Sequence, residues 1–238
     1  MTTLSKHARV AGLLYLALIL IAPVGLVVVP NLLLGSPNPA LTAHSLAAHE
    51  SLFRIAMFAD LVTATIDIFL ALALYRLLNG VDHGLAVLMV ILGLMSTPIY
   101  FVNTAVNDGG ALLFARGGEF LSAFSRPQQE AMTVLFLHLH HYGTVVNEVF
   151  WGLWLLPLGM LVYRSGFLPK FLGVWLIANG FAYVAQDAAG ILWPQYADIV
   201  GNAALPLQFG EIAIMLWLLV IGAREPRSGA IAATAQER

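Results

Sequence analysis

Residues 10–29 read VAGLLYLALILIAPVGLVVV, an apolar run that contains no charged side chain. A helix needs roughly 20 apolar residues to cross about 30 Å of hydrocarbon. Because backbone groups in lipid must form their hydrogen bonds within the segment, this run is predicted to be a transmembrane helix. The run is longer than the roughly 7–15 apolar residues of a secretory signal peptide, so we interpret it as a retained membrane anchor.

The composition of the whole chain agrees with this interpretation. Of the 238 residues, 60% are hydrophobic and 10% are charged, whereas soluble domains are about half apolar and about a quarter charged. The net charge of −2 offers no basic surface for nucleic acid. The chain has no cysteine, which excludes disulfides and iron–sulfur clusters. We therefore expect the lipid bilayer as partner and no cofactor, and the composition favours no particular oligomeric state.

Five further apolar runs follow the first. Together they predict an all-α bundle of six transmembrane helices that forms a single domain over residues 1–222, followed by a disordered cytosolic tail over 223–238. The six runs cover residues 10–29, 55–75, 84–106, 133–163, 171–193 and 205–222.

Lysine and arginine divide unequally between the two sides of this bundle. The richer side is expected to be cytosolic, so we predict that both chain ends are cytosolic. The richer side holds Lys6, Arg9, Arg76, Arg164, Lys170, Arg224, Arg227 and Arg238, and the other side holds Arg54, Arg116 and Arg126.

Two sequence signals mark helix starts outside the six runs. Asn38-Pro39 predicts a short outer helix that reaches Glu50, because asparagine caps a helix and proline suits its first turn. Ser125 with Gln128 predicts a capping box before the fourth run.

Glycine pairs and one proline predict breaks. Gly109-Gly110 and Gly117-Gly118 are expected to divide the segment after the third run into short pieces. The fourth run is too long for a perpendicular crossing, so it is expected to tilt, to kink at Pro157 or to protrude from the outer surface.

Four acids on four different predicted helices are expected at one depth. Counted from the cytosolic basic residue of each helix, Asp60, Glu148, Asp187 and Glu211 lie about 20–26 Å along the helix axis. Asp67 follows Asp60 on the same helix face. Charged groups inside a membrane cost at least about 2.5–3.5 kcal/mol each and therefore face protein or water. We predict a polar layer that binds a small molecule, a cation or a proton.

Further polar residues extend this layer at helical spacing. Arg54, at the outer end of the second run, is interpreted either as an interfacial side chain that reaches the headgroups or as a counter-ion to Asp60 or an anionic ligand. The other members of the predicted site are Tyr100, Asn103, Tyr183 and Gln208.

A histidine cluster supports a competing hypothesis. His138 and His141 share one helix face, as zinc ligands on a helix must. They are a candidate metal site, although counting places them near the outer interface, where histidines are commonly solvated. With Asp187 or another acid they would suit a metal-dependent intramembrane hydrolase.

Several stretches resemble a bacterial membrane family. They are RVAGLLY at 9–15, YRSGFLPK at 163–170, GE at 210–211 and LWLL at 216–219. The chain resembles the family catalogued as domain of unknown function 4386 from about Arg9 to Gly222. The resemblance implies a multi-pass protein of the bacterial plasma (inner) membrane, and it implies no catalytic residues.

Three hypotheses about function remain open from the sequence. The polar layer binds a ligand, cation or proton; or it only ties helices together through hydrogen bonds in a structural or accessory protein; or the protein is the metal-dependent hydrolase. Whether the protein is an enzyme stays open.

Overall fold

The computed structural model describes residues 3–223, and within that range every regular element is a helix. Residues 224–238, most of the predicted tail, lie outside the described part. The elements are α1 (Thr3–Pro23), η1 (Val24–Val28), α2 (Val29–Leu33), α3 (Pro39–Ala48), α4 (Glu50–Leu78), α5 (His83–Val102), η2 (Asn103–Asp108), α6 (Gly109–Arg116), η3 (Glu119–Leu121), α7 (Arg126–Arg164), α8 (Lys170–Leu192), η4 (Pro194–Tyr196), α9 (Ala197–Leu216) and η5 (Trp217–Ile221).

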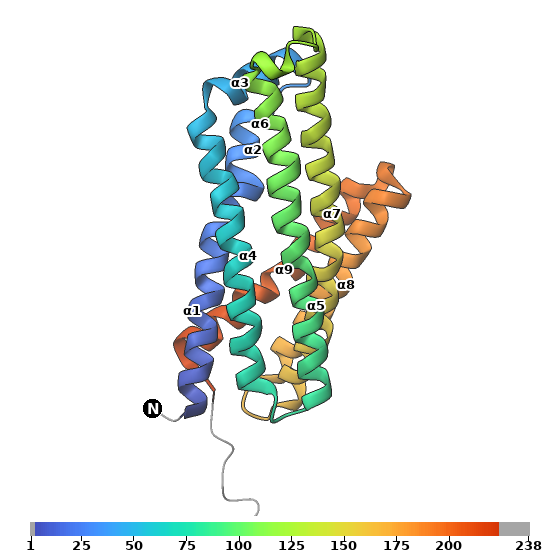
Figure 1. Ribbon diagram of the computed structural model, residues 1–238. Helices are drawn as coiled ribbons and strands as arrows, with labels where there is room; N and C mark the ends of the chain where they lie inside the picture. The colour runs from blue at the N-terminus through green and yellow to red at the C-terminus, as the bar shows by residue number, and fades with distance from the viewer. Residues whose placement is uncertain (1–2, 224–238) are drawn as a thin grey trace, which may run out of the picture.

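The long helices pack into one elongated bundle (Figure 1). In the described residues, five helical segments are long and apolar enough to cross a membrane: Thr3–Leu33, Glu50–Leu78, His83–Arg116, Arg126–Arg164 and Pro194–Ile221. Helix α8 has 23 residues but is not among these five. Large apolar side chains such as Phe58, Phe181 and Val220 face outward, as lipid-facing residues do. The all-α prediction is confirmed, and five of the six predicted crossings qualify as membrane spans.

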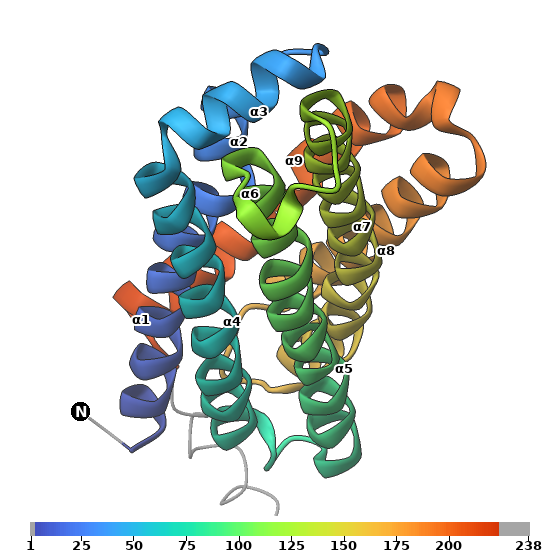
Figure 2. The same ribbon diagram turned by 45° about the horizontal axis from the view of Figure 1, so that its top comes forward.

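Both described chain ends lie at the same end of the bundle. A Cβ atom added to Gly222 would lie 3.0 Å from Oγ of Ser5. The turn between α4 and α5 lies at this end too, where Arg164 at the end of α7 donates a 3.1 Å hydrogen bond to Asp82. Helices α3 and α6 cover the opposite end, and the turn between α8 and α9 splays away from the bundle (Figure 2).

The helix starts follow the sequence signals. The side chain of Asn38 accepts a 2.9 Å hydrogen bond from the backbone N–H of Ala40 at the start of α3. At the start of α7, Ser125 and Gln128 form the predicted capping box, and the backbone N–H of Ser125 donates to Oε1 of Gln128 over 2.8 Å. Both caps are confirmed.

The predicted break at Gly109-Gly110 is wrong. The helix continues from α5 through the π-helical segment η2 into α6 and ends at Gly117-Gly118, where both glycines have positive φ. Gly110 serves close packing, because a Cβ there would lie 2.7 Å from the ring of Phe136 on α7. Pro157 does not interrupt α7, which is helical over all 39 residues.

Helices α7 and α8 meet through glycine pairs. A Cβ on Gly180 would lie 2.7 Å from the carbonyl oxygen of Gly152, and a Cβ on Gly173 would lie 2.6 Å from that of Gly159. Small residues allow helix backbones to approach closely in membranes. We call these two pairs the glycine seam; it fixes how the side chains of α7 and α8 face the rest of the bundle.

Candidate functional site

The predicted acids lie in three separate cavities, and the structure does not bring them together in one site. Asp67 and Glu211 line cavity 1, Asp60 lines cavity 2, and Glu148 and Asp187 line cavity 3. The cavities have volumes of about 270, 180 and 570 Å³, respectively. Cavities 1 and 3 share Gln208, and cavities 2 and 3 share His141 and Thr144.

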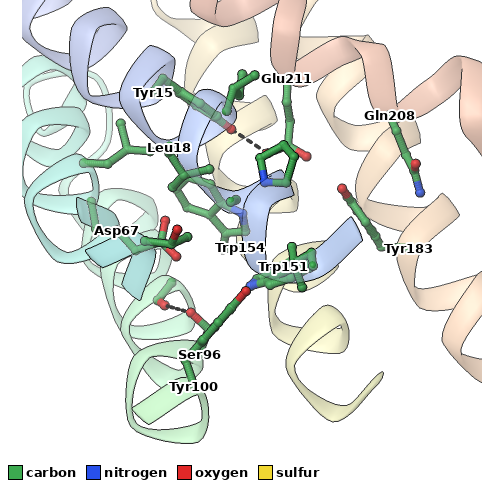
Figure 3. Close-up of a pocket in the computed structure, with 18 of the residues that line it drawn as sticks. Tyr15, Leu18, Asp67, Ser96, Tyr100, Trp151, Trp154, Tyr183, Gln208 and Glu211 are labelled. Atoms are coloured by element: carbon green, nitrogen blue, oxygen red, sulfur yellow. Dashed lines mark hydrogen bonds between the residues drawn. The ribbon is translucent and has the colours of Figure 1, made fainter. Parts of the chain in front are cut away.

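Cavity 1 lies among six helices, and each contributes a polar or aromatic side chain to it (Figure 3). Most of the remaining wall is apolar and includes Leu18, Ile19 and Leu26. No lysine, arginine or histidine is among the residues that line it. The aromatic and acidic members are Tyr15 on α1, Asp67 on α4, Tyr100 on α5, Trp151 and Trp154 on α7, Tyr183 on α8 and Glu211 on α9.

Glu211 is held by hydrogen bonds from two other helices. The hydroxyl of Tyr15 donates to Oε2 over 2.7 Å, and Nδ2 of Asn179 donates to Oε1 over 3.2 Å. Tyr15 and Asn179 are buried, so this geometry is fixed by packing. Each carboxyl oxygen still has a lone pair that can face a ligand.

The second acid of cavity 1 is less constrained. Asp67 is half-buried and projects toward the space beside Trp154 (Figure 3). In the part of the chain that the structure describes, no side chain donates a hydrogen bond to its carboxyl group. This carboxyl group is therefore free to meet a ligand.

Aromatic rings line the cavity between these acids in two sets. Tyr100 stacks on Trp151 with ring centroids 6.1 Å apart, and Trp151 meets Tyr183 edge-on at 6.4 Å. Tyr15 and Trp154 lie 6.3 Å apart on the other side. Aromatic faces attract cations when these lie within about 6 Å of the ring centre.

Cavity 2 joins Asp60 on α4 to a histidine–acid pair. Nδ1 of His140 on α7 lies 2.8 Å from Oδ1 of Asp108 in η2. Asn103, a predicted site residue, does not line this cavity. Its Nδ2 donates a 3.0 Å hydrogen bond to the backbone carbonyl of His140, and its Oδ1 accepts a 2.6 Å hydrogen bond from Nδ2 of Asn107. Asn103 therefore positions the turn that carries the histidine.

Cavity 3 is the most polar of the three. It lies where α8 and α9 splay from α7, and Glu148 and Asp187 face it together with Asp198. Nε2 of Gln208 donates a 3.2 Å hydrogen bond to Oε1 of Gln186. Because Gln208 also lines cavity 1, this glutamine pair separates the two cavities.

Arg54 lies outside all three cavities. Its side chain is 54% exposed, and Nε donates a 2.7 Å hydrogen bond to Glu50, which also pairs with Arg116. The interpretation of Arg54 as a counter-ion to Asp60 is therefore wrong in this structure, and the interfacial interpretation agrees with it.

The structure gives the histidine metal site no support. His138 and His141 are exposed, and in residues 3–223 no group of three or more histidines, cysteines, aspartates and glutamates is placed to hold a metal ion. It is His140, between them, that turns inward to Asp108.

The residues that line or support the cavities but were not among the predicted site residues include Tyr15, Asp108, His140, Trp151, Trp154 and Asn179. Tyr15 is the one side chain with hydrogen-bonding capacity in residues 10–29. A single polar side chain in an apolar run could have indicated a polar partner inside the bundle. Asp108 lies beyond the end of the predicted third helix, so its burial could not be foreseen. Asn179 lies within the predicted fifth run, but nothing in the sequence pattern pairs it with Glu211. Trp151 and Trp154 lie within the predicted fourth run, where nothing in the sequence distinguishes them from packing residues, and His140 lies between the two histidines of the candidate metal site.

Two comparisons with known proteins found similar sequences. Residues 10–222 match the family model described as Domain of unknown function (DUF4386). An uncharacterized protein of Archaeoglobus fulgidus is 27% identical over 160 residues, which cover 66% of this chain and 77% of that protein. No solved structure matches the chain.

Proposed function

The chain belongs to the family designated domain of unknown function 4386, and on that premise we propose that it is a multi-pass membrane protein that binds small organic cations in cavity 1. The observation that carries the proposal is that two carboxyl groups and five aromatic rings line one cavity without any basic residue. Aromatic cages with nearby acids are the recurrent way in which proteins bind quaternary ammonium ions.

The apolar part of the wall defines the rest of the ligand. Leucine, isoleucine and alanine side chains of α1 and α4 form one side of the cavity, opposite Trp151 and Tyr183. A ligand with a cationic centre and an apolar body would bury its body there at about 25 cal/mol per Å² of apolar surface. A bare inorganic ion would leave this wall without a partner.

In this proposal the chain crosses a plasma membrane six times and has both ends in the cytosol. This topology is supported by the placement of Lys6, Arg76, Arg164 and Lys170 at the end where both described chain ends lie, and by the positive-inside tendency. An even number of crossings follows if both ends share one side, so α8 is included as the sixth crossing.

Binding of benzyltrimethylammonium to the purified protein in micelles tests the proposal. We expect saturable quenching of tryptophan fluorescence, because Trp151 and Trp154 line the cavity. Neopentylbenzene, in which carbon replaces the charged nitrogen, should bind at least about tenfold more weakly, which corresponds to about 1.4 kcal/mol. Glu211→Gln and Asp67→Asn should remove most of this difference.

Glu119→Gln is the matched control, since Glu119 is exposed in η3, away from the three cavities. It should bind as the wild type does. Equal affinity for the charged and the neutral compound would contradict the proposal. Absence of saturable binding, combined with a lower melting temperature of Glu211→Gln, would instead favour a structural protein whose polar residues only join helices.

A further inference from the structure

Cavity 2 brings together three titratable side chains that cavity 1 does not use. Asp60 comes from α4, Asp108 from η2 and His140 from α7. Asp60 is 3% exposed and Asp108 is 4% exposed, so both carboxyl groups are removed from bulk water. Burying a carboxyl group away from water costs free energy unless the group is paired or protonated, so two such groups at one cavity require an explanation.

The backbone around this cavity is shaped to bring the groups close. Gly25, in the π-helical segment η1, lies against the carboxyl group of Asp60, and a Cβ atom at position 25 would collide with it. Gly143 on α7 likewise leaves room for the side chain of Asn103, which bonds the carbonyl of His140. Two π-helical segments, η1 and η2, thus border one cavity, and such segments occur frequently at functional sites.

Asp60 does not behave as a helix-joining residue. Its Oδ1 is buried and has no hydrogen-bond partner within the described residues. A carboxyl group that only tied helices together would have donors at its oxygens, because an unpaired buried polar atom costs about 1–3 kcal/mol. The unpartnered oxygen instead lies against Gly25, and both residues line cavity 2.

The charges that surround Asp60 do not balance. Asp108 from η2 and His140 and His141 from α7 are the titratable groups that line cavity 2 with it, and η1 and α2 contribute none. Arg54, on the same helix as Asp60, pairs with Glu50 instead. Protonated His140 would neutralise Asp108 alone and leave the charge of Asp60 uncompensated in a medium of low dielectric constant.

We propose that cavity 2 is a proton-binding site, in which Asp60 and the Asp108–His140 pair together hold one exchangeable proton. The proton forms an O–H bond with a carboxyl oxygen when it arrives from water and leaves to water again, with no change of oxidation state. Exposed His141 and half-buried Thr144 line both cavity 2 and cavity 3, and we assign the path of the proton to and from water to them. This site is separate from the cation site and does not depend on it.

Proton uptake by the purified protein in nanodiscs tests this proposal. The pH of a weakly buffered solution is lowered from alkaline to mildly acidic, and the protons bound per protein are counted. We expect Asp60→Asn to bind one proton fewer than the wild type, and Asp108→Asn to lose the same proton, because the two residues share it. Glu119→Gln is again the control for an exposed carboxyl group.

Infrared difference spectra identify the group in the same samples. The carboxylic-acid C=O band that appears on acidification in the wild type should be weaker in Asp60→Asn and unchanged when sodium is added at constant pH. Uptake equal to the wild type in both aspartate variants would overturn the proposal, as would loss of the band on addition of sodium. If the melting curve shows that Asp60→Asn does not fold, the proton uptake of Asp108→Asn alone tests the proposal.

Discussion

The hydroxyl group of Tyr15 donates a 2.7 Å hydrogen bond to Glu211, and the two residues are 196 positions apart in the chain. This bond joins α1 to α9, the first and last long helices of the described chain, at the wall of cavity 1. The same carboxyl group that we assign to ligand binding therefore also closes the bundle, so binding and stability are linked at Glu211.

Removing the Tyr15 hydroxyl separates these two roles. We expect Tyr15→Phe to lower the free energy of unfolding by about 0.6–2 kcal/mol, the range for hydrogen bonds between membrane helices. The preference of cavity 1 for a cation should persist, because Glu211 and Asp67 remain. Tyr196→Phe, at an exposed tyrosine in η4, is the control. Equal melting temperatures for the two variants would contradict the structural role of the bond.

Because of the glycine seam, the effect of a Gly→Ala substitution in α8 on the stability of the protein should depend on its position. Gly173→Ala should destabilise the protein by about 1–3 kcal/mol, because its Cβ would press against backbone atoms of Gly159 and Tyr163. Gly190→Ala, on the same helix, meets no atom within 4 Å and should be neutral or slightly stabilising. Thermal unfolding in micelles measures both, and an equal loss in the two variants would argue against the close contact.

Gly25 tests cavity 2 without changing any titratable group. Gly25→Ala places a methyl group in the position of the Asp60 carboxyl and must displace it. We expect proton uptake to fall by one proton, as in Asp60→Asn. Gly109→Ala, with no atom within 4 Å, is the control and should take up as many protons as the wild type. Unchanged uptake in Gly25→Ala would show that Asp60 does not need its place beside η1.

The absence of native cysteine makes the topology easy to measure. Single cysteines at Gly80 and Lys170 should react with a membrane-impermeant maleimide only from the cytosolic side. Cysteines at Ser122 and Gln195 should react only from the outside. Positions 170 and 195 flank α8, so labelling of both from one side would show that α8 does not cross the membrane.

The helices could be predicted from the sequence where neighbouring residues determine where a helix lies or begins. Apolar length located the six long helices, and the caps at Asn38 and Ser125 appear where side-chain acceptors precede proline. The Gly109-Gly110 prediction failed because a glycine pair signals a turn and close packing equally. Only the contact with Phe136, distant in the chain, distinguishes the two.

The cavities were beyond reach of the sequence for a geometric reason. The rise of about 1.5 Å per residue fixes the height of a side chain along its helix, and counting therefore grouped Asp60, Glu148, Asp187 and Glu211. The direction in which each side chain points depends on how the helices pack. That packing separates Asp60 from Glu211 and pairs Asp108 with His140.

The glycine seam also constrains how this protein can move. At each glycine pair the backbones of α7 and α8 are in contact, with Leu156 and Ile177 packed beside the glycines, so sliding one helix along the other would press side chains into backbone. We therefore expect α7 and α8 to move together as one rigid body. Any alternation of cavity 1 or cavity 3 between the two faces of the bilayer then falls to α9, which α8 meets through the Asn179–Glu211 bond and the pair Gln186–Gln208, and to α1, which Tyr15 joins to α9.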